Sequence, residues 1–163
     1  MSDPTAKLVS CAQAVALAER ARARGQRVVL ANGAFDLLHV GHVRYLAAAK
    51  ALGDLLIVAV NSDASVQSAK GPLRPVMPQA ERVEIVAHLA SVDVVLLFDE
   101  PTVTEVLRAI RPDVHAKGTD YTPATVPERA VVTEWGGATA ICGDPKDHAT
   151  TDLIGEICKR FSR

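Results

Sequence analysis

The residues best suited to chemistry in this chain are two histidines, His39 and His42, which stand three positions apart. They follow a short apolar run at 28–31 and lead into a helical pattern at 43–50. A spacing of three places both imidazoles on one face of a first helical turn, beside the unpaired N–H groups of the helix start. We therefore expect an anion site with two additional donors, which suits a phosphate group.

Two glycines fit this interpretation. Gly33 can adopt the backbone angles of a sharp turn after the strand, and Gly41 leaves room for a phosphoryl group to approach the backbone. In the alternative interpretation, His39 is a loop residue and His42 caps the helix or binds a metal. A zinc site needs further ligands, and no nearby cysteine, histidine or HExxH pattern supplies them, so we assign no metal to protein side chains.

Length and composition limit the classes of protein to consider. The 163 residues, 48% of them hydrophobic, predict one folded domain spanning 1–163. The net charge is −1, without the basic excess that a duplex-binding protein needs, and only 4% of residues are aromatic. We therefore expect no nucleic-acid partner.

The sequence also predicts no membrane partner. No apolar run reaches the length that spans a bilayer, and the first residues lack a signal-peptide pattern. Cys11, Cys142 and Cys158 are odd in number and far apart, which argues against a disulfide framework and favours a cytoplasmic location.

The elements that must position the histidines alternate along the chain. Short apolar runs predict strands, and helical periodicity predicts helices between them. The expected strands are 27–31, 55–60, 92–98, 114–116 and 138–142, and the expected helices are 12–24, 41–52, 79–89, 102–110, 127–135 and 150–161. This order predicts a Rossmann-like three-layer α/β/α fold with a parallel sheet. Residues 1–25 would form an N-terminal helical extension, its helix on the surface, and 70–78 a loop.

Polar clusters follow several of these strands. They are Asn32-Gly33 with the histidines, 61–63, 117–120 and 143–151. Ligands of open parallel sheets bind outside the carboxyl ends of the strands, so we expect these clusters to converge on one crevice. The chain contains neither a GxxxxGK[ST] nor a GxGxxG motif, which argues against a P-loop or a dinucleotide site.

The segment from Gly33 to His42 matches a GxFDxxHxGH signature, and on it the chain resembles the HxGH nucleotidyltransferase superfamily. Most of the chain is similar to one branch, the D-glycero-β-D-manno-heptose 1-phosphate adenylyltransferases, in free-standing form. The segments that carry this similarity are 61–63, 70–71, 74–75, 117–121 and 150–151. Three positions depart from the branch: Ala31, Thr119 and Ala149 stand where it usually has Thr, Gly and Ser. These departures do not affect the expected class of enzyme, but they leave the identity of the sugar phosphate open.

The resemblance implies a direct in-line displacement, in which the sugar phosphate attacks the α-phosphorus of ATP and pyrophosphate leaves. It implies Mg²⁺ bound mainly by substrate phosphates and water, and a homodimer. His39, His42 and Lys70 would be catalytic. A cytidylyltransferase acting on glycerol 3-phosphate or another polyol phosphate is the enzyme alternative, and a silent nucleotide-binding scaffold is the alternative of a different class.

Further residues are carried over from matching positions or chosen for their place at strand ends. The expected nucleotide contacts, besides the catalytic residues, are Asn32, Gly33, Ala34, Phe35, Gly41, Lys117, Gly118, Thr150 and Thr151. The expected substrate contacts are Asp36, Asn61, Asp63, Arg74, Arg82 and Asp120. Other interpretations stay open for three of them. Lys70 can be a solvated loop lysine, Arg82 can pair with neighbouring acidic residues, and Thr150 can be a plain helix cap.

Overall fold

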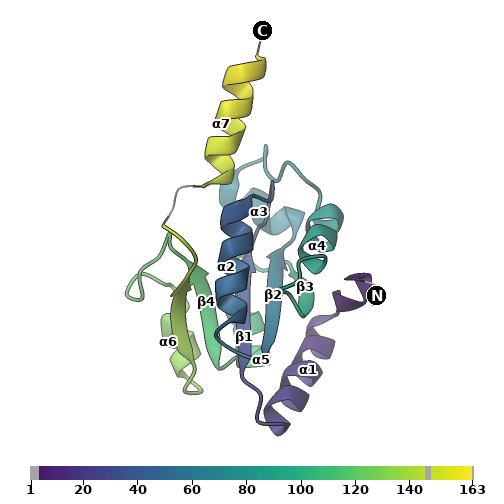
Figure 1. Cartoon of the computed structure of the whole chain (residues 1–163), viewed down its shortest axis with the longest axis vertical. Coiled ribbons are helices and arrows are strands. Elements are labelled where there is room, and N and C mark those ends of the chain that lie inside the picture. Colours follow the sequence, from purple (N-terminus) through teal and green to yellow (C-terminus); the bar gives the residue numbers. More distant parts are fainter. Residues whose placement is uncertain (1–3, 146–147, 163) are drawn as a thin grey trace.

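The chain folds around one parallel sheet. The computed structural model describes residues 4–145 and 148–162. Five strands lie in the order β3-β2-β1-β4-β5 (Figure 1). They are β1 (Val28–Gly33), β2 (Leu55–Asn61), β3 (Val94–Phe98), β4 (Val114–Gly118) and β5 (Ala138–Cys142). The chain order reverses at β1, so β1 and β4 flank the topological switch point where such sheets bind ligands.

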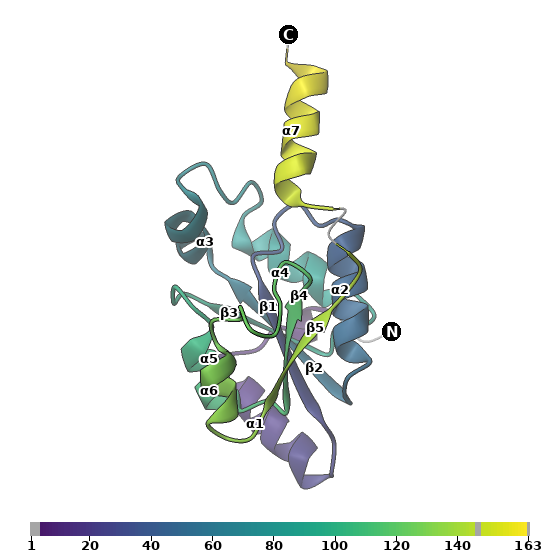
Figure 2. The ribbon, with the colours of Figure 1, turned by 90° about the vertical axis from the view of Figure 1, so that its left-hand side faces the viewer.

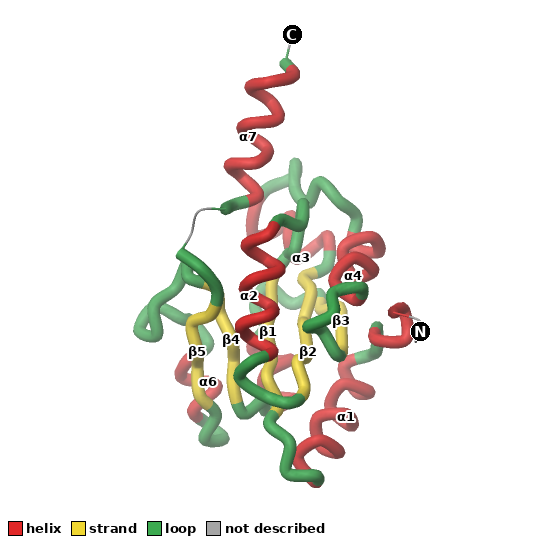
Figure 3. Tube along the Cα trace, in the orientation of Figure 1, coloured by secondary structure: helices red, strands yellow, loops and turns green. Residues whose placement is uncertain are grey.

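Helices cover both faces of the sheet, which confirms the predicted three-layer α/β/α fold (Figures 1 and 3). Helices α2 (Val40–Lys50) and α4 (Gln79–Ala87) pack on one face. Helices α1 (Cys11–Ala23), α5 (Thr104–Ile110) and α6 (Arg129–Thr133) pack on the other. Successive strand residues alternate between the two cores: Val29 and Ala31 belong to the first, and Val28 and Leu30 to the second.

The predicted strands and helices are all present, with ends that differ by up to two residues. Helix α3 (Asp63–Lys70) is an addition, so Lys70 ends a helix rather than beginning a loop. Before α1 stands the short 3₁₀ helix η1 (Pro4–Lys7). Helix α1 is not a surface helix, because Ala14, Ala18 and Ala21 pack in the core against the sheet.

Helix α7 (Thr150–Phe161) differs from the others. It begins near the carboxyl ends of the strands and extends away from the domain (Figures 1 and 2). None of its described residues is buried.

No helix within the described ranges is long and apolar enough to cross a membrane.

Candidate active site

The turn after β1 presents the two histidines. Phe35 and Leu37 adopt left-handed backbone angles, with φ of 50° and 46°, which are uncommon for side chains of this size. The ring of Phe35 is buried and folds back toward Gly33, where an added Cβ would lie 3.2 Å from it. Glycine at this position therefore lets the chain reverse tightly and deliver His39 to the start of α2.

His39 is the N-cap of α2 and His42 lies in its first turn. The two rings stack, with centroids 3.9 Å apart and planes at 27°. The backbone N–H of His39 donates to Nδ1 of His42 at 3.4 Å, which leaves Nε2 of His42 to carry the proton. Burial, with His39 and Lys70 nearby, lowers the pKa of His42 to about 4. At neutral pH, His42 is therefore an uncharged donor.

A third imidazole joins this pair. The ring of His148, which precedes α7, lies 6.2 Å from that of His39 between centroids. Burial and then His148 lower the pKa of His39. A Cβ added at Gly41 would lie 3.0 Å from the His39 ring and 3.3 Å from Cβ of His148. The missing side chain at Gly41 thus makes room for imidazoles.

These residues line a cavity of about 340 Å³ at the carboxyl ends of the strands. All three predicted catalytic residues, His39, His42 and Lys70, line it. The other predicted contacts in its wall are Asn32, Gly33, Ala34, Phe35, Gly41, Asn61, Lys117, Gly118 and Asp120. The cavity lies at the switch point expected from the strand order.

Lys117 is the most enclosed cation of the cavity. Its side chain is 8% exposed, as is that of Glu128, and Nζ lies 3.6 Å from Oε2 of Glu128. The same Nζ lies 4.6 Å from the centre of the Tyr121 ring. Burial lowers the pKa of Lys117, and Glu128 opposes this shift. The ion pair with Glu128 therefore fixes the amino group of Lys117 in the cavity wall.

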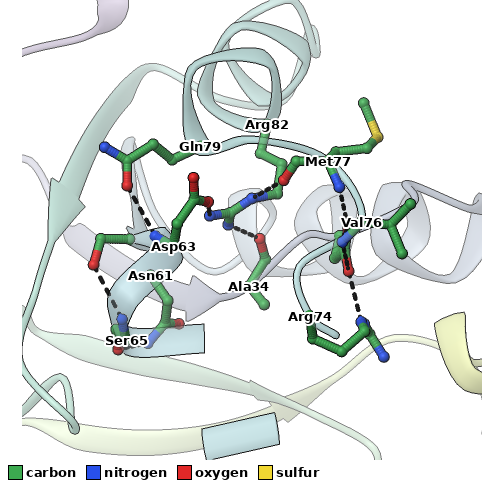
Figure 4. Close-up of polar contacts among 11 residues, drawn as sticks. Ala34, Asn61, Asp63, Ser65, Arg74, Val76, Met77, Gln79 and Arg82 are labelled. Carbon is green, nitrogen blue, oxygen red and sulfur yellow. Dashed lines mark hydrogen bonds and ion pairs between the residues drawn. The ribbon is translucent and has the colours of Figure 1, made fainter. Parts of the chain in front are cut away.

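Several predicted substrate contacts lie behind the cavity wall instead. The carboxylate of Asp36, a residue only 2% exposed, accepts from Nε of Arg74 at 2.7 Å and from the backbone N–H groups of Val76 and Met77 (Figure 4). Although burial acts to raise it, these donors lower the pKa of Asp36. Asp36 and Arg74 therefore join the 71–78 loop to the histidine turn.

Arg82 is fully buried and performs a similar task from α4. Its guanidinium donates to the carbonyl oxygens of Ala34 and Met77 and to Oδ1 of Asp63 at 2.8 Å (Figure 4). With these partners and no exposed surface, it connects α3, the 71–78 loop and the turn after β1. Arg82 therefore pairs with Asp63 and does not line the cavity.

Thr150 and Thr151 are also outside the cavity wall. The hydroxyl of Thr150 donates to the carbonyl oxygen of Asp36 at 2.7 Å, and Thr151 is exposed. The N-cap of α7 is Ala149, which makes no side-chain cap hydrogen bond, so Thr150 is not a plain helix cap. This contact attaches the start of α7 to the histidine turn.

Sequence reasoning missed two cavity residues, Tyr45 and Cys142. The hydroxyl of Tyr45 donates to the carbonyl oxygen of Ala116 at 2.7 Å, which ties α2 to β4. Both residues read as core positions on amphipathic elements, so spacing alone carried no signal for them. Only the fold brings them to the floor of the site.

The sequence pattern of the cytidylyltransferase-like family matches residues 30–152. The bifunctional protein HldE of Syntrophotalea carbinolica is 46% identical over 142 residues, which cover 87% of this chain and 29% of that protein. The HldE of Pelobacter propionicus is 42% identical over 161 residues, covering 99% and 33%. The chain thus spans about a third of the length of these relatives.

Two solved structures are similar. One is the lipopolysaccharide core biosynthesis protein of Thermoplasma volcanium, with a TM-score of 0.60 and 30% identity over 72% of this chain and 94% of that one. The other is a pantoate-beta-alanine ligase of Francisella tularensis, with a TM-score of 0.62 and 16% identity over 94% and 76%. The second likeness concerns the fold alone.

Proposed function

Because the chain belongs to the cytidylyltransferase-like family, we propose that it transfers the AMP moiety of ATP to D-glycero-β-D-manno-heptose 1-phosphate, giving ADP-heptose and pyrophosphate. The observation that carries this proposal is the stacked pair His39 and His42 at the helix start that lines the cavity. The heptose acceptor is supported by the 117–121 segment and by the similarity to HldE and to a lipopolysaccharide core biosynthesis protein.

In the proposed reaction, a phosphate oxygen of the sugar attacks the α-phosphorus of ATP. The bond from that phosphorus to the bridging oxygen breaks, and pyrophosphate leaves with the electron pair. The Nε2–H of His42 and the backbone N–H groups at the start of α2 donate to the charged α-phosphate oxygens. Lys70, at the end of α3 in the cavity wall, supplies charge for the departing phosphates.

The proposed cofactor is a divalent metal, Mg²⁺, which would be held together with the nucleotide. Within residues 4–145 and 148–162, no three histidine, cysteine or carboxylate side chains converge as metal ligands. These residues fit an ion that phosphates and water would hold, and Asp120 and Asp144 are the carboxylates in the cavity wall. When bound, the metal neutralises phosphate charge.

All three cysteines are free thiols, which supports the expected cytoplasmic location.

The acceptor would occupy the part of the cavity beside β4 and β5. Thr119 and Asp144 both line it, and the hydroxyl of Thr119 donates to the carbonyl oxygen of Asp144 at 2.7 Å. Thr119, which replaces the glycine usual in the branch, therefore connects the two loops that would enclose the sugar. Asp120 and Lys117 also line the cavity and are the proposed contacts for sugar hydroxyls and phosphate.

A homodimer is part of the proposal, and α7 supports it. Its exposed apolar residues are Leu153, Ile157 and Phe161, and Ile154 is partly buried. The acidic Asp152 and Glu156 precede the basic Lys159 and Arg160 along the helix, so an antiparallel second copy would match both the charges and the apolar face. Light scattering should give a dimer mass, and Ile157→Glu should give a monomer. Gly155→Glu, on the opposite side of the helix, is the control and should stay dimeric.

Pyrophosphate release tests the activity. ATP, CTP, GTP and UTP are each combined with Mg²⁺ and with heptose 1-phosphate, glycerol 3-phosphate and other sugar phosphates. We expect turnover with ATP and the heptose. His42→Ala should lower kcat by about 10²–10³, the cost of one preorganised donor, with His88→Ala, an exposed histidine on α4's end, as control. Preference for CTP would favour the cytidylyltransferase alternative. No turnover with any pair of nucleotide and acceptor would favour the alternative of a silent nucleotide-binding scaffold.

A further inference from the structure

A fully buried histidine lies directly beneath the cavity. His115 on β4 has no exposed surface, and its Nε2 lies 2.9 Å from Oδ1 of Asn32. His115 is the cross-strand partner of Leu30 on β1, and Asn32 follows on the same face two residues later. Asn32 is half-buried and lines the cavity. The histidine thus contacts a cavity residue from below without reaching the cavity itself.

The surroundings of His115 decide which ring nitrogen carries the proton. Nδ1 is buried and has no hydrogen-bond partner among the described residues. Burial and the nearby charge of Lys117 lower the pKa of His115 to about 3, so the ring is neutral. A proton on Nδ1 would be an unpaired buried donor close to a cation, whereas a lone pair there is tolerated more easily. The proton therefore belongs on Nε2.

A donor at Nε2 fixes the carboxamide of Asn32. Its Oδ1 must accept from His115, so its Nδ2 is left to face away from the ring. We propose that His115 is a positioning residue, which holds the Asn32 amide so that its NH₂ group donates to an oxygen of a bound substrate at the cavity floor. This inference deepens the proposed function, because the oxygen belongs either to the nucleotide or to the sugar phosphate.

The position itself favours this role over simple packing. His115 lies among core residues of the second face, where an aliphatic side chain would avoid the cost of an unpaired ring nitrogen. Thr139 on β5 is its cross-strand partner on the other side, and the buried hydroxyl of Thr139 also has no hydrogen-bond partner in the described part of the chain. Only His115 of this pair reaches a cavity residue, which makes Thr139 a matched control.

The first test needs no substrate. In ¹H–¹⁵N spectra, the side-chain NH₂ of Asn32 should give two sharp proton signals at positions set by the fixed orientation of the amide. We expect His115→Leu to average or shift these signals, and His115→Gln, whose amide N–H can replace Nε2–H, to restore them. Thr139→Val should leave them unchanged. An Asn32 signal that His115→Leu does not alter would overturn the proposal, even if the proposed reaction proves correct.

The second test is kinetic and uses the same variants. His115→Leu should lower kcat/KM about tenfold, and His115→Gln should recover to within about threefold of the original chain. Asn32→Ala should cause a similar loss, and adding His115→Leu to it should cause none further. The substrate whose KM rises identifies the source of the oxygen. If the losses of kcat/KM from Asn32→Ala and His115→Leu add in the double variant, His115 does not act through Asn32. A loss of kcat/KM that parallels a lower free energy of unfolding in urea would likewise show a merely structural histidine.

Discussion

Substituting Gly41 by alanine separates the stability of α2 from the placement of its histidines. An alanine Cβ would lie 3.0 Å from the His39 ring, where ordinary contacts begin at 3.4 Å. The ring must therefore move by about 0.4 Å. Since a misplacement of about 1 Å costs roughly 10² in rate, this shift should lower kcat roughly five- to tenfold. The same substitution improves helix propensity by up to about 1 kcal/mol, so the thermal midpoint should not fall.

Steady-state pyrophosphate release and thermal unfolding measure the two effects. Gly155→Ala is the matched control, because it is also a helical glycine and an added Cβ meets nothing within 4 Å. It should gain stability and keep full activity. Unchanged kcat in Gly41→Ala would refute the account of the His39 position, and equal loss in both variants would point to a general effect of helix stiffening.

Three further predictions follow from the buried polar contacts. Arg82→Met removes donors to two carbonyl oxygens and Asp63, and should lower the free energy of unfolding in urea by about 3–5 kcal/mol. The exposed Arg108→Met should change it little, and equal effects would contradict the role of burial. Asp36→Asn weakens the acceptor of Val76 and Met77, so hydrogen exchange at these amides should quicken about tenfold; unchanged rates would contradict the anchoring. Between pH 6 and 4.5, His42 and His115 take up protons in the unfolded chain but not in the folded chain, because their folded pKa values are about 4 and 3. The free energy of unfolding should therefore fall as pH falls, by at most about 1.4 kcal/mol per pH unit for each histidine. His115→Gln should reduce this slope. A slope equal to that of the original chain would contradict the contribution of His115 to the pH dependence.

The sequence predicted the layers of the fold well because each buried strand is a continuous apolar run. The run at 55–60 became β2 with one residue added, and 150–161 became α7 without change. Helix α3 escaped prediction because its eight residues bury only Ser65 and Val66, which leaves little apolar periodicity. The prediction of a surface helix at 12–24 is wrong because an alanine-rich pattern does not by itself distinguish a core helix from a surface helix.

The site was predictable where one short segment carries it. His39, Gly41 and His42 lie within a single turn, so their spacing alone predicts that they lie together. The roles of Arg82 and His115 depend on partners 48 and 83 residues away in the chain, which spacing cannot reveal. A buried arginine and a buried histidine have no local pattern that distinguishes them from surface residues.

In the proposed reaction, the two stacked imidazoles hold the phosphorus centre at which the nucleotide reacts. A crystal structure with Mg²⁺ and a non-hydrolysable ATP analogue tests it most directly. We predict α-phosphate oxygens within hydrogen-bond distance of Nε2 of His42 and close to the His39 ring, inside the cavity that also includes Lys70. A nucleotide bound with its α-phosphate away from both rings would contradict the account.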